Sequence, residues 1–71
     1  MTQIEAEIAA TVWKVLVAEG AQVAVDDDVV ILESMKMEIP VTSPVAGRVV
    51  EVRVVADDKV DEGQVLVVVE G

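Results

Sequence analysis

The fold of this chain follows from a stretch that occurs twice. Residues 9–33 read AATVWKVLVAEGAQVAVDDDVVILE, and residues 46–70 read AGRVVEVRVVADDKVDEGQVLVVVE. The two copies align without a gap at an offset of 37 positions, and valines such as Val12 and Val49 recur at matching places. An ungapped repeat indicates two copies of one structural unit. Half a chain is too small to bury its own apolar face, so we expect the copies to pack around a pseudo-two-fold axis.

The first part of each copy has the pattern of a half-buried strand. Residues 50–54 alternate apolar and polar side chains, which is the period of a strand with one face in water, and residues 13–17 follow the same pattern except that Leu16 stands in the place of Arg53. Val12 and Val49 fall out of phase with this alternation in the same way. The shared slip predicts a β-bulge or a strand break at both places.

The last part of each copy is a continuous apolar run, at residues 29–32 and 65–69. Runs of this length indicate strands that are buried on both faces or paired centrally. No window has the 3.6-residue apolar period of a helix. Residues 1–71 are therefore predicted to form one all-β domain, a flattened barrel or sandwich (a barrel-sandwich hybrid) of two pseudo-symmetric halves. Turns are predicted at residues 19–21, 26–28, 43–47, 57–58 and 61–63.

Composition limits the functions that this chain can have. It contains no cysteine and no histidine, so it has no thiolate ligand, no disulfide and no imidazole for proton transfer. Its net charge of −9 opposes binding to nucleic acid or to an anionic membrane. No apolar run reaches the length of a membrane span, and residues 1–5 lack the basic start of a signal peptide. We therefore expect a cytoplasmic protein without an independent catalytic centre.

One stretch conflicts with its predicted structure. The chain must reverse between the apolar run 29–32 and residues 39–41 if these segments pair, and the intervening residues read ESMKME. A tight hairpin normally has Asn-Gly, Asp-Gly or Gly at its tip, because its turn needs positive φ. Met35-Lys36-Met37 stands there instead. Such a conflict between sequence and predicted structure is expected at a functional site. The second copy of the repeat has no counterpart to this tip, because the matching position is at Glu70-Gly71.

The string from Glu33 to Glu38 resembles the biotin attachment motif of the biotin carboxyl carrier family, in which Met-Lys-Met holds the biotinylated lysine. The resemblance covers nearly the whole chain, with Gly20, Gly63 and Gln64 at the family's turn positions. It departs from the family pattern at Ala21, Asp26 and Asp57, where Asp, Gly and Gly are usual. Aspartate tolerates left-handed backbone better than most residues, so we expect these turns to survive. The second-half matches are Pro44, Gly47, Val49, Val52 and Val54.

The resemblance implies a carrier rather than an enzyme. Biotin protein ligase would join biotin, activated as an adenylate, to the amine of Lys36, and the ligase and carboxylase would recognise Met35 and Met37 by apolar contact. The loaded chain would then visit a biotin carboxylase and a carboxyltransferase, and the hard chemistry would belong to the cofactor and the partner enzymes. Glu33 and Glu38 are interpreted as strand-end charges.

Two other functions stay open. A lipoyl carrier has nearly the same fold and also has Glu three residues before its lysine, but it usually shows Asp-Lys-Ala around that lysine. An unmodified β interaction module would carry no cofactor at all. Trp13 is interpreted as a packing residue, and Asp26–Asp28 as a polar turn, because the spacing of a calcium loop is missing. The acceptor substrate, whether an acyl-CoA, pyruvate or urea, stays open, and so do the oligomeric state and the docking surface.

Overall fold

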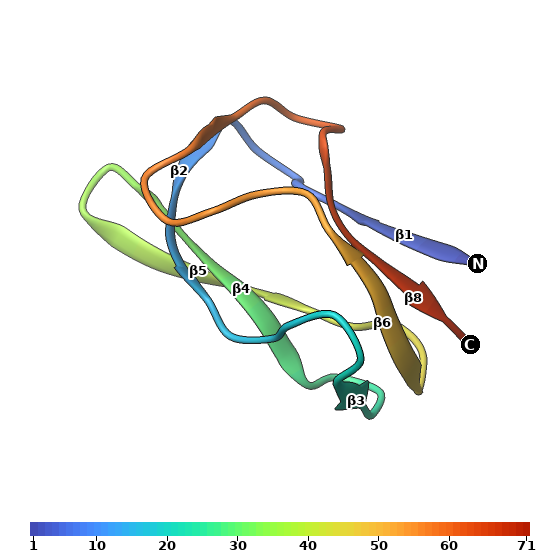
Figure 1. Cartoon of the computed structure of the whole chain (residues 1–71). Coiled ribbons are helices and arrows are strands. Elements are labelled where there is room, and N and C mark those ends of the chain that lie inside the picture. Colours follow the sequence, from blue (N-terminus) through green and yellow to red (C-terminus); the bar gives the residue numbers. More distant parts are fainter.

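The computed structural model describes residues 1–71, and all of its regular structure is β-strand, as predicted. The strands form two four-stranded antiparallel sheets, in the orders β1-β8-β6-β3 and β5-β4-β2-β7 (Figure 1). None of the chain forms a helix that is long and apolar enough to cross a membrane. The eight strands are β1 (Thr2–Glu5), β2 (Ala10–Val15), β3 (Gln22–Val23), β4 (Asp28–Ser34), β5 (Met37–Thr42), β6 (Gly47–Val52), β7 (Lys59–Val60) and β8 (Val65–Glu70).

A shift of 37 positions carries one sheet onto the other. β2, β3 and β4 each begin 37 positions before β6, β7 and β8, and β1 takes the place of β5, so the two sheet orders are equivalent. Connections repeat as well. The N–H of Val12 donates to the carbonyl of Asp58 over 2.7 Å, and the N–H of Val49 donates to the carbonyl of Ala21 over 2.8 Å. The pseudo-two-fold arrangement predicted from the repeat is therefore confirmed.

The core lies between the two sheets and is centred on β4 and β8. Successive residues of these strands are buried, so both of their faces are covered, and this explains why their sequences are continuously apolar rather than alternating. Val29, Val30 and Leu32 of β4 are buried, and so are their repeat partners Leu66, Val67 and Val69 of β8. Branched aliphatic side chains pack well on such pleated surfaces, so the core forms without any Phe or Tyr.

Both copies contain the predicted bulge. The ladder register shifts at Trp13 in β2 and at Val50 in β6, 37 positions later. Trp13 and its neighbour Lys14 are both exposed, and the Lys14 ammonium lies 4.4 Å from the centroid of the indole ring. The interpretation of Trp13 as a packing residue is therefore corrected, because the bulge interrupts the in–out alternation and leaves this side chain at the surface.

The ends of β2 and β6 differ from the prediction. Both strands begin three residues earlier and end two residues earlier than the alternating stretches 13–17 and 50–54. The alternation continues past the strand ends because Val17 and Val54 pack on the core from the loops that follow. An alternating pattern thus reports which side chains are buried, and the hydrogen-bonded ladder stops earlier.

Four turn residues outside the β4–β5 hairpin have left-handed backbone, and they form two symmetric pairs. Gly20 (φ 91°) corresponds to Asp57 (φ 78°), and Asp26 (φ 71°) corresponds to Gly63 (φ 86°). Glycine and aspartate are among the few residue types that visit this region readily. The expectation that the turns survive the change to Asp26 and Asp57 is confirmed.

Candidate functional site

The tip of the β4–β5 hairpin is a two-residue loop. The ladder between the two strands runs as far as Ser34 opposite Met37, which leaves only Met35 and Lys36 in the turn (Figure 1). Their φ angles are 53° and 64°. Positive φ at both central residues is the requirement of a tight type I′ hairpin, whose twist matches that of the flanking strands. The structure therefore confirms that Lys36 lies at a hairpin tip.

The residues at this tip are poorly suited to its backbone. All the other positive φ angles in the chain fall on glycine or aspartate, whereas this turn places methionine and lysine there. Left-handed backbone costs an ordinary L-residue about 1–2 kcal/mol. Because Asn-Gly would relieve this strain, the Met-Lys sequence costs stability. Residues held in such conformations concentrate at functional sites.

The side chains at the tip are open to solvent. Met35 is 91% exposed and Met37 is 65% exposed, although methionine is ordinarily a core residue. Lys36 is exposed too, and it takes part in no hydrogen bond or ion pair. Its ammonium group is therefore free to enter the active site of another protein, with a flexible apolar side chain on either side of it.

The strands just below the tip carry unpaired negative charge. Glu33 of β4 stands directly opposite Glu38 of β5, and both are exposed. On its other side Glu33 faces Thr11 of β2, which offers no cation. In the other sheet the repeat partner of Glu33 is Glu70, whose carboxylate pairs with Arg48 at 3.5 Å. Only the tip end thus retains two facing carboxylates without a neutralising residue, which lowers stability slightly.

The acidic turn at residues 26–28 has a structural role. Asp26 occupies a left-handed position, and the Asp27 carboxylate accepts a hydrogen bond of 2.8 Å from the N–H of Ala24. No group of three or more carboxylates is placed to share a metal ion anywhere in the chain. The chain also has no histidine or cysteine that could serve as a base or nucleophile beside Lys36. The tip presents one primary amine, that of Lys36, above the two carboxylates of Glu33 and Glu38.

Comparison with known proteins agrees with this geometry. The profile of the Biotin_lipoyl family, described as "Biotin-requiring enzyme", matches residues 1–69. The chain is 47% identical over 66 residues to the "Biotinylated protein TB7.3 homolog" of Mycobacterium leprae, and the match covers 93% of each protein. It is 44% identical over 63 residues to the "Biotin/lipoyl attachment protein" of Bacillus subtilis, covering 89% of this chain and 86% of that protein.

A solved structure of a carboxylase contains the same fold. The chain superimposes on the crystal structure of the Kluyveromyces lactis urea carboxylase with a TM-score of 0.91 and 29% sequence identity. The match covers 97% of this chain but only 6% of the enzyme, so the fold corresponds to one small part of a much larger protein. On the profile match, the full-length relatives and the shared fold, the chain belongs to the biotin/lipoyl attachment family.

Proposed function

We propose that residues 1–71 form one biotinyl domain that carries biotin on Lys36 and acts as a carboxyl carrier for a biotin-dependent carboxylase. The observation that carries the proposal is the tip itself, where an unpaired lysine lies between two exposed methionines in a strained two-residue turn. Its relatives support the choice, because one is named as a biotinylated protein and another is a urea carboxylase.

The tip suits covalent attachment of biotin. The Lys36 Nζ would form an amide with the carboxyl group of biotin, and this bond replaces a charged ammonium by a neutral nitrogen. Since the Lys36 side chain makes no hydrogen bond or ion pair, attachment would break no polar interaction of the folded domain. When bound, biotin would supply a ureido nitrogen that accepts and releases a carboxyl group, and the domain would supply position.

The two methionines would supply the contacts that partners recognise. Met35 and Met37 project from the body of the domain, and the thioether side chain of methionine adapts to irregular apolar surfaces. Three active sites must accept this tip in turn: those of biotin protein ligase, biotin carboxylase and carboxyltransferase. A flexible apolar pair beside the lysine fits that requirement better than a rigid or charged pair. The chain is therefore a substrate of the ligase and a carrier subunit, not a catalyst.

A lipoyl carrier is the second candidate. The Bacillus subtilis relative is named for both cofactors, and Glu33 lies three residues before Lys36, where lipoyl domains also have glutamate. The methionines favour biotin, because lipoyl domains usually have Asp and Ala at those positions.

Transfer of a labelled carboxyl group tests the proposal. The chain is first incubated with biotin protein ligase, biotin and ATP, and then with a biotin carboxylase, ATP and radiolabelled bicarbonate. We expect acid-labile label on the chain in proportion to its biotin content, and none on the Lys36→Arg variant. The carrier role would be contradicted if the chain takes up biotin but gains no carboxyl label from any of several biotin carboxylases, taken from enzymes with different acceptor substrates.

A further inference from the structure

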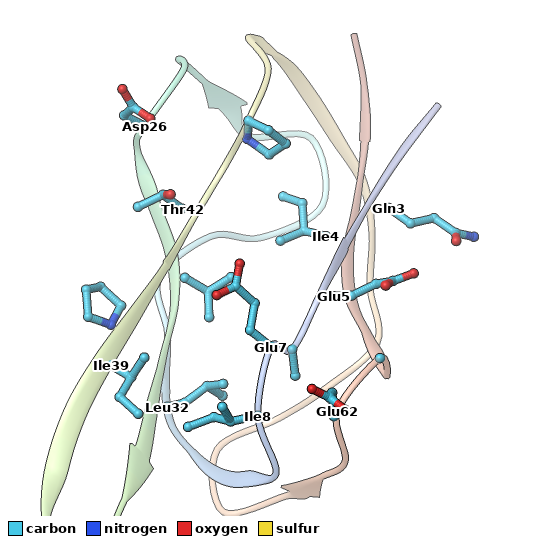
Figure 2. Close-up of a pocket in the computed structure, with 15 residues that line it drawn as sticks. Gln3, Ile4, Glu5, Glu7, Ile8, Asp26, Leu32, Ile39, Thr42 and Glu62 are labelled. Carbon is cyan, nitrogen blue, oxygen red and sulfur yellow. The ribbon is translucent and has the colours of Figure 1, made fainter.

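A groove separates the two sheets along one side of the molecule. Its volume is about 890 Å³, and it lies between β1 with the loop that follows it and the edge strand β5 (Figure 2). β1 is hydrogen-bonded only to β8, and β5 only to β4, so each strand has one free edge. Apolar side chains from both sheets, including Ile4, Leu32 and Ile39, line the groove (Figure 2). Nothing in the chain covers it.

The two walls of the groove are pseudo-symmetric in backbone but different in sequence. On β5 and the loop after it, two of three alternating positions are proline, at Pro40 and Pro44. The corresponding positions on the β1 side, 37 residues earlier, are Gln3 and Glu7. Proline has no N–H, so a strand cannot add to the edge of β5 at these positions. β1 has no such block, and its residues make no backbone hydrogen bond outside the ladder with β8.

The symmetry also shows which way one free N–H of β1 points. Pro40 sits in the ladder opposite Ile31, and β5 tolerates it there because an edge strand can place a proline with its nitrogen away from the neighbour. Gln3 is its repeat partner and sits opposite Val68 in the β1–β8 ladder. The N–H of Gln3 therefore points away from β8, toward the space that an added strand would occupy.

The groove is negatively charged. Four carboxylates line it, and none of the five lysine and arginine residues of the chain does. None of the four belongs to an ion pair. Figure 2 shows Glu7 between β1 and β5, and Gln3 and Glu5 on the side of β1 that faces away from β5. A second copy of this chain, with a net charge of −9, would be repelled from this surface. The four carboxylates are Glu5, Glu7, Asp26 and Glu62.

We propose that β1 and this groove dock an extended segment of a partner protein in which basic and apolar residues alternate. The segment would add to the free edge of β1 by main-chain hydrogen bonds. Its inward side chains would be apolar and would contact Ile39 in the groove. Its outward side chains would be basic and would lie beside Gln3 and Glu5, because successive side chains of a strand alternate between faces.

This docking mode leaves the tip free. The groove ends at the pair Leu32–Ile39, and two further ladder pairs, Glu33–Glu38 and Ser34–Met37, separate it from the turn. A partner bound along β1 would thus hold the domain without covering Lys36. Binding at this groove would not depend on the proposed cofactor, because no atom of Lys36 takes part in the contact.

The test uses the full chain and a synthetic peptide with blocked ends in which lysine and valine alternate. Backbone amide chemical shifts of the isotope-labelled chain are followed as peptide is added at low ionic strength. We expect saturable shifts over residues 3–8 and 39–41. A block isomer of the same composition, with its lysines and valines separated, should bind about tenfold more weakly, because it cannot place one residue type on each face. Equal binding of the two isomers would overturn the proposal.

Two variants separate strand addition from simple charge attraction. Gln3→Pro removes the free N–H but no charge, and should weaken binding of the alternating peptide by about tenfold. Glu5→Lys should weaken it more than Glu19→Lys, which makes the same change of charge at an exposed turn away from the groove. Unchanged affinity of Gln3→Pro, with an unchanged melting temperature, would show that the peptide does not add as a strand. Equal effects of the two lysine variants would show non-specific attraction.

Peptide binding at the groove and biotin attachment at Lys36 can be tested separately on the same variants. Biotin incorporation is measured on the same variants, and we expect Gln3→Pro and Glu5→Lys to be labelled as wild type. Loss of peptide binding with full labelling would leave the carrier assignment intact. Full peptide binding by a chain that takes up no biotin would leave the docking surface intact.

Discussion

The two ends of this molecule are formed by equivalent pairs of strands, but only one of these pairs is joined by a turn. At one end β4 and β5 run together past the pair Leu32–Ile39 and close in the Met35–Lys36 turn. At the other end the ladder between β1 and β8 stops at the equivalent pair Thr2–Val69, close to the two termini of the described chain (Figure 1). Within residues 1–71 only the β4–β5 pair of strands is therefore joined by a turn.

The two ends also differ in the residues that surround the paired strands. At the chain ends Glu70 pairs with Arg48, and Gly47 gives the Glu70 carbonyl the space it needs. At the tip end the equivalent residues of Arg48 and Gly47 are Thr11 and Ala10, which do neither. The chain ends thus carry an ion pair and a close backbone contact, whereas the tip end keeps unpaired carboxylates and a strained turn. This contrast supports the proposal that the tip binds another protein.

The largest effect is expected at Lys36, and the chain supplies its own controls. Lys36→Arg should abolish attachment of any cofactor, because a guanidinium group does not act as an acyl acceptor at neutral pH. Lys14→Arg and Lys59→Arg change the other two lysines in the same way and should leave labelling complete. Intact mass after incubation with ligase checks all three variants. Residual labelling of Lys36→Arg would place the attachment site elsewhere.

The next effect concerns the crowded chain end. A Cβ atom at Gly47 would overlap the carbonyl group of Glu70, so Gly47→Ala should lower the free energy of unfolding by about 1–3 kcal/mol. The symmetric change at the tip end, Ala10→Gly, should cost only about 0.5–1 kcal/mol, through chain entropy. Urea unfolding of both variants measures the difference. Equal losses would show that the two ends are packed alike.

A turn substitution should separate stability from recognition at the tip. Met35→Gly relieves one left-handed residue and removes almost no buried surface, so we expect the free energy of unfolding to rise by about 1 kcal/mol. The same change would remove the apolar contact that we propose between Met35 and the ligase. Loss of about 1.5 kcal/mol of that contact corresponds to roughly tenfold lower kcat/KM for biotinylation. A variant that is both less stable and fully labelled would contradict this account of the tip.

The smallest effect compares two equivalent turns. The Asp58 carboxylate accepts a hydrogen bond of 3.0 Å from the N–H of Val55, whereas Ala21, its repeat partner, offers no such acceptor. Asp58→Ala should therefore lower the free energy of unfolding by about 1 kcal/mol, and Ala21→Asp should raise it by about 0.5 kcal/mol. Thermal unfolding of both variants provides the check. A loss of stability in Ala21→Asp would mean that the two turns differ in backbone as well as in sequence.

The sequence predicted the parts of the fold that the repeat records. The offset of 37, the bulges at Trp13 and Val50 and the central strands β4 and β8 all follow from valines that recur in both copies. β1 was not predicted, because Thr2–Glu5 shares no identical residue with the matching part of β5, residues 39–42. Pairing of β1 depends on β8, which lies at the other end of the chain.

The candidate site was predicted from a local conflict. Positive φ at a hairpin tip and the residues Met35-Lys36 are incompatible preferences, and both are visible in the sequence. The groove was not visible there, because its walls come from β1 and β5 and its carboxylates from four separated positions. Only the folded chain shows that β1 and the loop after it lie across the groove from β5 and the loop that follows β5.

We expect the choice between biotin and lipoate to depend on the two methionines. If the ligase holds Met35 in an apolar groove, as proposed, an aspartate at this position would bring an unpaired charge into that groove, which costs several kcal/mol. The double variant Met35→Asp with Met37→Ala should therefore lose most of its biotinylation and gain lipoylation. Competition between the two ligases for this variant, followed by intact mass, checks the shift.

The same competition applied to the wild-type chain distinguishes a biotin carrier from a lipoyl carrier. The chain is incubated with biotin protein ligase, lipoate ligase, both cofactors and ATP, and its intact mass is recorded. We expect a single added biotin, which peptide mapping assigns to Lys36, and no lipoate. A chain that takes up lipoate and refuses biotin would contradict the account and identify a lipoyl carrier instead.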